Sequence, residues 1–174
     1  MLGRAPIVDF DGTLARLDVD WEGLRRQLGL QSLDDLWQRV SGDRAGWYES
    51  PEWRLVTSAE VAAAGRAASV TALVTALGAC AGFAVLTGNS EAAVSAFLDR
   101  QPGLRDLCLT VAGRETLRGS KRDPLAFARG FRPCAEATAA ARAGDPPVYV
   151  GDLAWELVQA RRMGAIAFDV REVG

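Results

Sequence analysis

The stretch APIVDFDGTL, from Ala5 to Leu14, decides how this sequence folds. Its apolar first part predicts a buried strand, and Asp11-Gly12 predicts a turn at the end of that strand. Asp9 and Asp11 would then stand where a parallel strand runs out into its loop, which is where open α/β sheets bind ligands. On its own, an Asp-x-Asp-Gly sequence is as often only a turn in which the aspartates accept hydrogen bonds from backbone amides.

Further apolar runs resemble the first one and predict the other strands of a sheet: Gly82–Thr87, Leu107–Ala112, Pro147–Gly151 and Ala165–Val170. Apolar residues at helical spacing separate these runs, for example over 70–77 and 153–160. Uniformly apolar strands that alternate with amphipathic helices predict an α/β fold, in which helices cover both faces of a parallel sheet. The Ala-rich stretch 133–143 is ambiguous and fits a weakly packed helix.

Residues 15–69 have a different pattern, which contains no strand signal. Apolar spacing predicts two helices there, one on Trp21, Leu24 and Leu28 and one on Leu33, Leu36, Trp37 and Val40 behind Ser32 as N-cap. We therefore expect a small helical insertion over 15–69 and a core formed by 1–14 and 70–174.

Size and charge narrow the class of protein. The 174 residues, 49% of them hydrophobic, suit one compact domain. A formal net charge of -2 gives no broad reason to expect nucleic acid or an anionic membrane surface as a partner. The longest apolar runs are far shorter than the roughly 20 residues of a membrane span, and the N-terminus lacks the pattern of a signal peptide. We expect a soluble, cytoplasmic monomer or homodimer.

The rare residue types limit the chemistry. The sequence contains no histidine, which excludes histidine triads, histidine bases and histidine metal ligands. Cys80, Cys108 and Cys134 are too widely spaced for a disulfide framework or a zinc site, so we expect them to be reduced and mostly buried. Catalysis would have to use carboxylates, hydroxyls, cationic side chains or a metal.

Two more motifs follow the second and third predicted strands. Leu86-Thr87-Gly88-Asn89-Ser90 offers a hydroxyl, an amide and backbone N–H groups that could hold a phosphate oxygen, although alone it is better explained as a helix cap. Lys121, within Gly119-Ser120-Lys121-Arg122-Asp123-Pro124, is the only lysine of a chain that otherwise uses arginine. A lone lysine is usually a solvated surface residue, but the choice of a compact ammonium here makes a specific role plausible.

The fourth predicted strand ends in Gly151-Asp152-Leu153-Ala154-Trp155-Glu156. Asp152 and Glu156 are spaced so that both carboxylates project from one face at the start of a helix. They could simply favour the positive N-terminus of that helix. Together with Asp9 they would instead form an oxygen-rich site suited to Mg²⁺.

In this order, DFDGTL, LTGNS, the lysine of GSKRDP and GDLAWE resemble the four motifs of the haloacid dehalogenase-like hydrolases. The resemblance covers nearly the whole chain and points to the phosphoglycolate phosphatase-like branch with a short helical cap. It implies a Rossmann-like parallel sheet with strand order 3-2-1-4-5 and a cap inserted after the first motif. The activity it implies is a Mg²⁺-dependent phosphatase acting on a small phosphorylated metabolite.

The resemblance also implies a role for each motif residue. Asp9 would be the nucleophile, Asp11 the acid–base, and Thr87 would hold a phosphoryl oxygen, while Lys121 would balance the charge of Asp9 and the phosphate. The phosphate-binding residues would be Gly12, Thr13, Gly88 and Asn89. The Mg²⁺ ligands would be Asp9, Asp152, Glu156 and the main-chain carbonyl of Asp11. A carboxylate can attack phosphorus only where cations offset the repulsion between two anions, which fits this set.

The sequence departs from the family pattern at Arg122, where many relatives have proline, and at Glu156, where aspartate is commoner. The longer reach of Glu156 leaves open whether it would bind the metal directly or through water. Asp11 favours phosphoryl transfer, because dehalogenases lack an acid at that position. A phosphomutase would need a tightly closing cap, and a dinucleotide-binding oxidoreductase would need a glycine-rich fingerprint at the first strand.

A further alternative is a regulatory module that binds a phospho-ligand on the same fold without turnover. No catalytic position is missing, which argues against it. In the insertion, side chains that could contact a substrate are Arg16, Arg25, Arg26, Arg44 and Trp47. Arginines on helices are usually solvated and tryptophans usually pack, so the sequence does not identify the substrate.

Overall fold

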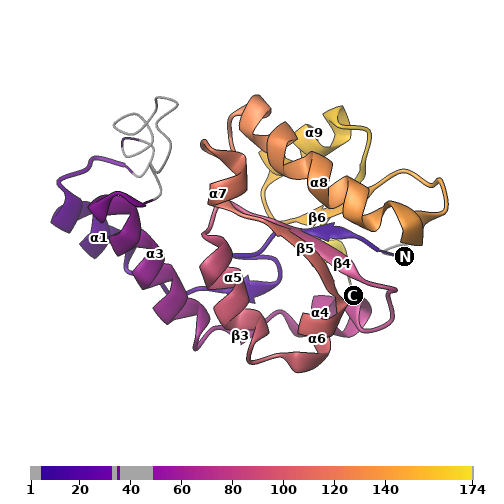
Figure 1. The fold of residues 1–174 in the computed structure, drawn as a ribbon, viewed down its shortest axis with the longest axis horizontal. Helices are drawn as coiled ribbons and strands as arrows, with labels where there is room; N and C mark the ends of the chain where they lie inside the picture. The colour runs from indigo at the N-terminus through magenta and orange to yellow at the C-terminus, as the bar shows by residue number, and fades with distance from the viewer. Residues whose placement is uncertain (1–4, 33–34, 36–48, 174) are drawn as a thin grey trace.

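The computed structural model describes residues 5–32, 35 and 49–173, and its centre is a five-stranded parallel sheet (Figure 1). The strands lie in the order β5-β4-β1-β6-β7. Their bounds are β1 Ile7–Val8, β4 Phe83–Leu86, β5 Cys108–Ala112, β6 Val148–Gly151 and β7 Ile166–Asp169. Each lies within one of the apolar runs, and counted along the chain the order is 3-2-1-4-5. The predicted α/β fold and its strand order are confirmed.

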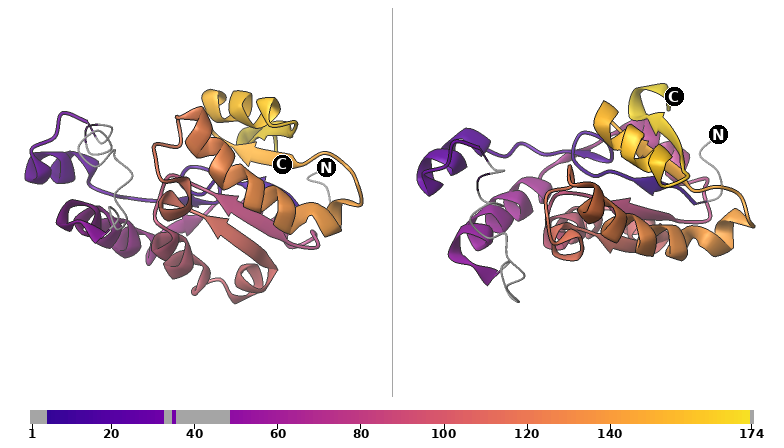
Figure 2. Two further views of the ribbon diagram at one scale, coloured as in Figure 1. Left: turned by 45° about the horizontal axis from the view of Figure 1, so that its top comes forward. Right: turned by 90° about the horizontal axis from the view of Figure 1, so that it is seen from above.

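Helices cover both faces of the sheet (Figure 2). One face carries α4 Thr71–Leu77, α5 Glu91–Leu98 and α6 Pro102–Leu107. The other carries α7 Arg114–Leu117, α8 Pro124–Arg142 and α9 Ala154–Arg162. The 3-10 turn η2, Val170–Glu172, follows β7. The ambiguous Ala-rich stretch is the second half of α8.

The central strands are apolar throughout because both of their faces are buried. In β1, Ile7 packs among the residues of α8 and α9, whereas Val8 packs among those of α4 and α5. In β6, Tyr149 and Val150 divide in the same way. Successive strand residues point to opposite faces, so a strand covered on both sides cannot show an alternating pattern.

Two helices of segment 15–69 lie beside the sheet (Figures 1 and 2). They are α1, Trp21–Leu28, and α3, Pro51–Ala64. Ser32 and Asp35 exchange the hydrogen bonds of an N-terminal capping box, as expected, from Asp35 N to Ser32 Oγ at 3.3 Å and from Ser32 N to Asp35 Oδ2 at 2.8 Å. The rest of the helix predicted there lies outside the described residues.

The absence of a strand in segment 15–69 was a wrong prediction. The antiparallel strands β2, Ala15–Arg16, and β3, Ala68–Ser69, pair where the chain leaves and rejoins the sheet. A two-residue strand is too short to leave a periodic pattern in the sequence. The division of the chain into core and insertion stays a prediction, although this pair lies at both ends of the expected insertion.

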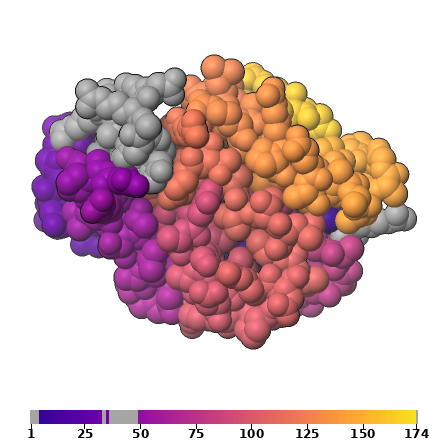
Figure 3. Space-filling view, in the orientation of Figure 1, coloured from indigo at the N-terminus to yellow at the C-terminus, as the bar shows by residue number. Residues whose placement is uncertain are grey.

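The helix α3 connects segment 15–69 to the sheet because it packs against α5 (Figure 3). Near the start of α3, Trp53 and Val56 form a small apolar cluster with Leu30. None of the helices among the described residues has the length and apolar character that a membrane span requires. None of the three cysteines forms a disulfide, but only Cys134 is fully buried, whereas Cys80 and Cys108 are half-buried.

Candidate active site

Three carboxylates of the predicted motifs meet at the carboxyl end of the sheet. Asp9 follows β1, Asp152 follows β6, and Glu156 lies in the first turn of α9. Each offers one oxygen, and these oxygens lie within 4.8 Å of one another. Because β1 and β6 are neighbours in the sheet, their ends bring the first and fourth motifs together. We call Asp9, Asp152 and Glu156 the acidic cluster.

The first loop is shaped to admit the carboxylate of Asp152. Gly12 has φ +86°, and a Cβ atom there would lie 2.4 Å from Asp152 Oδ2, so only glycine fits. The other oxygen, Asp152 Oδ1, is buried and has no hydrogen-bond partner within 5–32, 35 and 49–173. A buried oxygen without a donor, beside two further carboxylates, fits a cation ligand.

Lys121 is the ammonium of the site and contacts two members of the acidic cluster. Its Nζ lies 2.5 Å from Asp9 Oδ1 and 3.2 Å from Glu156 Oε2, and the residue is only 7% exposed. Two residues after the lysine, Asp123 caps the N-terminus of α8. Burial lowers the pKa of Lys121, but Asp9 and Glu156 outweigh burial and raise that pKa above its ordinary value. Lys121 is therefore charged.

Glu156 is fixed by two donors on the same oxygen. Tyr149, fully buried in β6, donates its hydroxyl to Glu156 Oε2 at 2.7 Å, and Lys121 reaches that oxygen as well. Burial raises the pKa of Glu156 to about 7, with Lys121 acting in the opposite direction. Burial and then the charge of Asp9 likewise raise the pKa of Asp152. The cluster holds more negative charge than Lys121 alone compensates.

Asp11 is half-buried beside the acidic cluster. Its Oδ1 accepts a hydrogen bond from Leu17 N at 2.9 Å, which favours the carboxylate form. Burial outweighs that bond and, helped by Asp9 and Asp152, raises the pKa of Asp11 to about 6. Such a group can both give and take a proton near neutral pH, as an acid–base residue must.

The expected phosphate-binding residues lie in two loops at this end of the sheet. Thr87 and Asn89 are buried, whereas Gly88 between them is exposed. Thr87 Oγ donates to Asn89 Oδ1 at 3.0 Å and accepts from Asn89 N at 3.1 Å. In the first loop, Thr13 is fully buried and its Oγ has no partner among the described side chains and backbone.

Sequence reasoning missed Glu60, Arg114 and Tyr149. Glu60 lies on α3, is 2% exposed, and contacts both Asn89 and the guanidinium of Arg114. The available signal was its position seven residues after Trp53 and four after Val56, in the buried stripe of an amphipathic helix. Tyr149 left no signal, because a tyrosine in a buried strand reads as a core residue.

We considered the arginines of segment 15–69 as possible substrate contacts and expected them to be solvated, and no described contact joins them to the acidic cluster. Arg25 donates from its guanidinium to Gln31 O at 3.0 Å, within segment 15–69. Arg16 and Arg26 are exposed. Arg44 and Trp47 lie outside the described residues.

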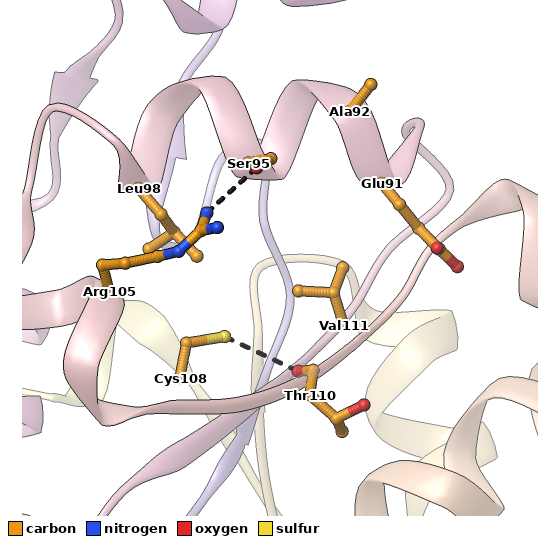
Figure 4. A pocket seen from close by; sticks show the side chains of 8 residues that line it. All are labelled: Glu91, Ala92, Ser95, Leu98, Arg105, Cys108, Thr110 and Val111. Carbon is orange, nitrogen blue, oxygen red and sulfur yellow. Dashed lines mark hydrogen bonds between the residues drawn. The ribbon is translucent and has the colours of Figure 1, made fainter.

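A hollow of about 460 Å³ lies between α5, α6 and β5 (Figure 4). Arg105 crosses it and donates to Ser95 Oγ at 2.9 Å. Its one thiol, Cys108, points to Thr110 O, and burial raises the pKa of this thiol to about 11, so it is protonated and unreactive at neutral pH. The hollow shares no residue with the acidic cluster or Lys121, so the candidate site is the sheet end.

Comparison with solved structures identifies proteins that have a similar fold. No family model and no curated protein matches the sequence. L-2-haloacid dehalogenase from Xanthobacter autotrophicus, with chloropropionic acid covalently bound, has a TM-score of 0.57 and 17% identity over 95% of this chain and 76% of its own. A haloacid dehalogenase-like phosphatase from Thermococcus onnurineus has a TM-score of 0.52 and 18% identity over 94% of this chain and 84% of its own.

A haloacid dehalogenase-like hydrolase from Streptococcus pneumoniae has a TM-score of 0.55 and 14% identity over 95% of this chain and 83% of its own. Identities this low show the fold alone. Because the structures include both a dehalogenase and a phosphatase, the likeness does not choose between the two reactions. That choice depends on the side chains at the carboxyl end of the sheet.

Proposed function

On the premise of a haloacid dehalogenase-like fold, we propose that this protein is a Mg²⁺-dependent phosphatase that hydrolyses a small phosphorylated metabolite through an aspartyl phosphate on Asp9. One observation carries the proposal. Asp9 belongs to the acidic cluster and contacts the ammonium of Lys121 at 2.5 Å, and Asp11, two residues on, has a pKa raised to about 6 by burial. A nucleophile, a charge-balancing cation and an acid thus stand together.

Asp11 supports phosphoryl transfer over dehalogenation. A halide is a very weak base and leaves carbon without a proton, so a dehalogenase needs no acid beside its nucleophile. An alkoxide is a strong base and needs a proton as it leaves phosphorus. A half-buried carboxyl group that holds its proton to about pH 6 serves the second reaction.

The reaction would proceed in two displacements. An oxygen of Asp9 attacks phosphorus, the bond from phosphorus to the ester oxygen breaks, and Asp11 gives its proton to the leaving alkoxide. Asp11 then takes a proton from water, whose oxygen bonds to phosphorus while the bond to Asp9 breaks and inorganic phosphate is released. Lys121 holds Asp9 throughout, and Thr87 with the exposed amide of Gly88 would hold the phosphoryl oxygens.

The residues present fit a magnesium ion. The orphaned buried oxygen of Asp152, the all-oxygen donor set and the absence of histidine from the sequence suit Mg²⁺ rather than zinc. Asp9, Asp152 and the Asp11 carbonyl would hold it, with Glu156 binding directly or through water. When bound, the ion offsets the negative charge that phosphate and Asp9 bring together.

The net charge of the protein bears on the class of its substrate. The net charge of -2 gives no electrostatic support for a nucleic-acid substrate, and small phosphorylated metabolites are the alternative. None of the three cysteines forms a disulfide, which supports a reducing compartment, so we place the reaction in the cytoplasm.

The test is a panel of phosphorylated metabolites and a 2-haloacid, each assayed with Mg²⁺. We expect release of inorganic phosphate, and an acid-quenched sample should carry a phosphoryl group on Asp9 by peptide mass spectrometry. Halide release without phosphate release would overturn the proposal in favour of dehalogenation. Binding of an ester without turnover would favour the regulatory module.

A further inference from the structure

Glu60 belongs to segment 15–69, and its buried carboxylate contacts the loop of the second motif, Leu86–Ser90. It lies on α3, far along the chain from the residues it contacts, and is 2% exposed. Its Oε1 accepts from Asn89 Nδ2 at 3.1 Å, and its Oε2 accepts from Ser90 N at 3.0 Å. The guanidinium of Arg114 donates to Oε2 as well. Glu60 thus satisfies two donors of the loop and is neutralised by an arginine.

The contacts continue from Asn89 to Thr87. An amide group has one oxygen and one nitrogen, so when Nδ2 faces Glu60, Oδ1 must face the other way. There it accepts the hydroxyl of Thr87 at 3.0 Å. Without Glu60, the amide could turn over and present its NH₂ group to Thr87. The orientation of the Thr87 hydroxyl therefore depends on Glu60 through one rigid amide.

Glu60 needs to be a carboxylate for this role. A glutamine would offer one acceptor oxygen where three donors converge, and its own NH₂ group would face at least one of them. A tether between α3 and the sheet would not need a charge, because apolar residues such as Trp53 and Val56 already occupy the same stripe of α3. Replacing a buried ion pair by apolar groups is often neutral or stabilising, so the pair is not explained by stability alone.

We propose that Glu60 is a positioning residue, which fixes the side-chain amide of Asn89 and through it the Thr87 side chain, so that the exposed amide of Gly88 between them is set to donate to a phosphoryl oxygen. This inference rests on the proposed function, because it assigns this loop to the phosphoryl group. It also gives α3 a defined part in the chemistry, since the carboxylate reaches the loop only while α3 is packed on α5.

The composition of the chain supplies a probe, because Asn89 is the only asparagine. Protein labelled with ¹⁵N-asparagine gives side-chain amide signals from this residue alone. In the wild type we expect two well-separated NH₂ protons that exchange slowly with water. In Glu60→Gln they should move towards the positions of a free amide and exchange about tenfold faster or more. Glu52→Gln is the matched control, with the same substitution at a half-buried position in the first turn of the same helix.

The kinetic measurement uses p-nitrophenyl phosphate with Mg²⁺. Misplacing one group that holds the phosphoryl oxygens should lower kcat/KM by roughly tenfold to a hundredfold. In an Asn89→Ala background, Glu60→Gln should have almost no further effect, because Glu60 acts through Asn89. Independent, additive losses would mean a purely structural role and would overturn the proposal.

The NMR signals of the Asn89 side-chain amide test the role of Glu60 independently of any measurement of catalytic activity. Unchanged Asn89 signals in a folded Glu60→Gln protein would overturn the proposal, as would rapid exchange of these protons in the wild type. If Glu60→Gln fails to fold because Arg114 is left unpaired, Glu60→Gln/Arg114→Met removes both charges and is read in the same way. If the wild-type protein hydrolyses no phosphate ester, the proposed function is refuted. The amide spectrum would still show whether Glu60 fixes the side chain of Asn89.

Discussion

Two groups of buried charges lie near each other at the carboxyl end of the sheet, and they differ in balance. Glu60 and Arg114 form a one-to-one pair. The acidic cluster of Asp9, Asp152 and Glu156 faces a single ammonium, that of Lys121. A balanced pair is complete and can position its neighbours, whereas an unbalanced cluster needs a further cation. The contrast assigns positioning to the first group and metal-assisted chemistry to the second.

The largest effect should follow from replacing the nucleophile in the unbalanced cluster. Asp9→Asn keeps the shape of the side chain but removes the attacking oxyanion, so turnover of every phosphate ester should fall by roughly a thousandfold or more. The thermal unfolding midpoint should change little, because Lys121 keeps Glu156 as a partner. Steady-state rates with Mg²⁺ measure the first effect and calorimetry the second. Wild-type activity in this variant would refute the assignment.

The next effect is on the free energy of unfolding, which should fall when the ammonium of the cluster is removed and rise when one of its carboxylates is neutralised. Lys121→Met leaves the buried carboxylates unpaired and should lower the free energy of unfolding of the metal-free protein by about 3–5 kcal/mol. Asp152→Asn relieves repulsion from Asp9 and should raise it, by about 1 kcal/mol or less, because Asp152 is only half-buried. Urea unfolding in EDTA measures both. A destabilised Asp152→Asn protein would mean that the cluster is not over-charged.

Metal binding should remove the imbalance, and its effect should depend on pH. Burial raises the pKa of Asp11 to about 6 and that of Glu156 to about 7. Folded-state pKa values above the unfolded ones stabilise the metal-free protein at low pH, and this contribution is lost as the pH rises through the raised values. Mg²⁺ favours the ionised form of Glu156, which is among its expected ligands, so the ion should bind better at higher pH.

Excess Mg²⁺ should therefore raise the free energy of unfolding more at about pH 8 than at about pH 5.5, by up to roughly 2.7 kcal/mol where the ion is at a hundred times its Kd. EDTA should abolish turnover and Mg²⁺ should restore it. Ca²⁺ is a control for general ionic effects, since it accepts the same ligands with a different geometry. A pH-independent shift, or full activity without metal, would contradict the assignment of the acidic cluster.

The same contrast explains what the sequence could predict. The sheet was readable because its strands are continuous apolar runs. Asp9 and Asp152 directly follow two of these strands, and Glu156 lies four residues after Asp152 in the helix that comes next. The balanced pair was not readable, because Glu60 and Arg114 are 54 positions apart and each looks like an ordinary charge on a helix. Pairing between distant side chains depends on how α3 packs on the sheet, which no local pattern encodes.

The smallest effect should come from the arginine of α1 that the sequence suggested as a substrate contact. Arg25 donates to Gln31 O within segment 15–69, and no described contact joins it to the acidic cluster. If this segment is a cap, Arg25→Ala should raise KM for the preferred metabolite by about two- to tenfold, since only binding common to ground and transition states is lost. Hydrolysis of p-nitrophenyl phosphate should stay within about twofold, because so small an ester makes few contacts with a cap.

Arg54→Ala, at an exposed arginine of α3 that was not a candidate for substrate contact, is the matched control and should change neither value. Asp11→Asn gives the opposite pattern, a loss of turnover for both esters, because its proton serves every leaving alkoxide. A change in preference from Arg25→Ala alone would place substrate choice in segment 15–69. Equal losses for both esters in Arg25→Ala would instead make the segment a structural brace, so that α3, through Glu60, would be its one link to the chemistry.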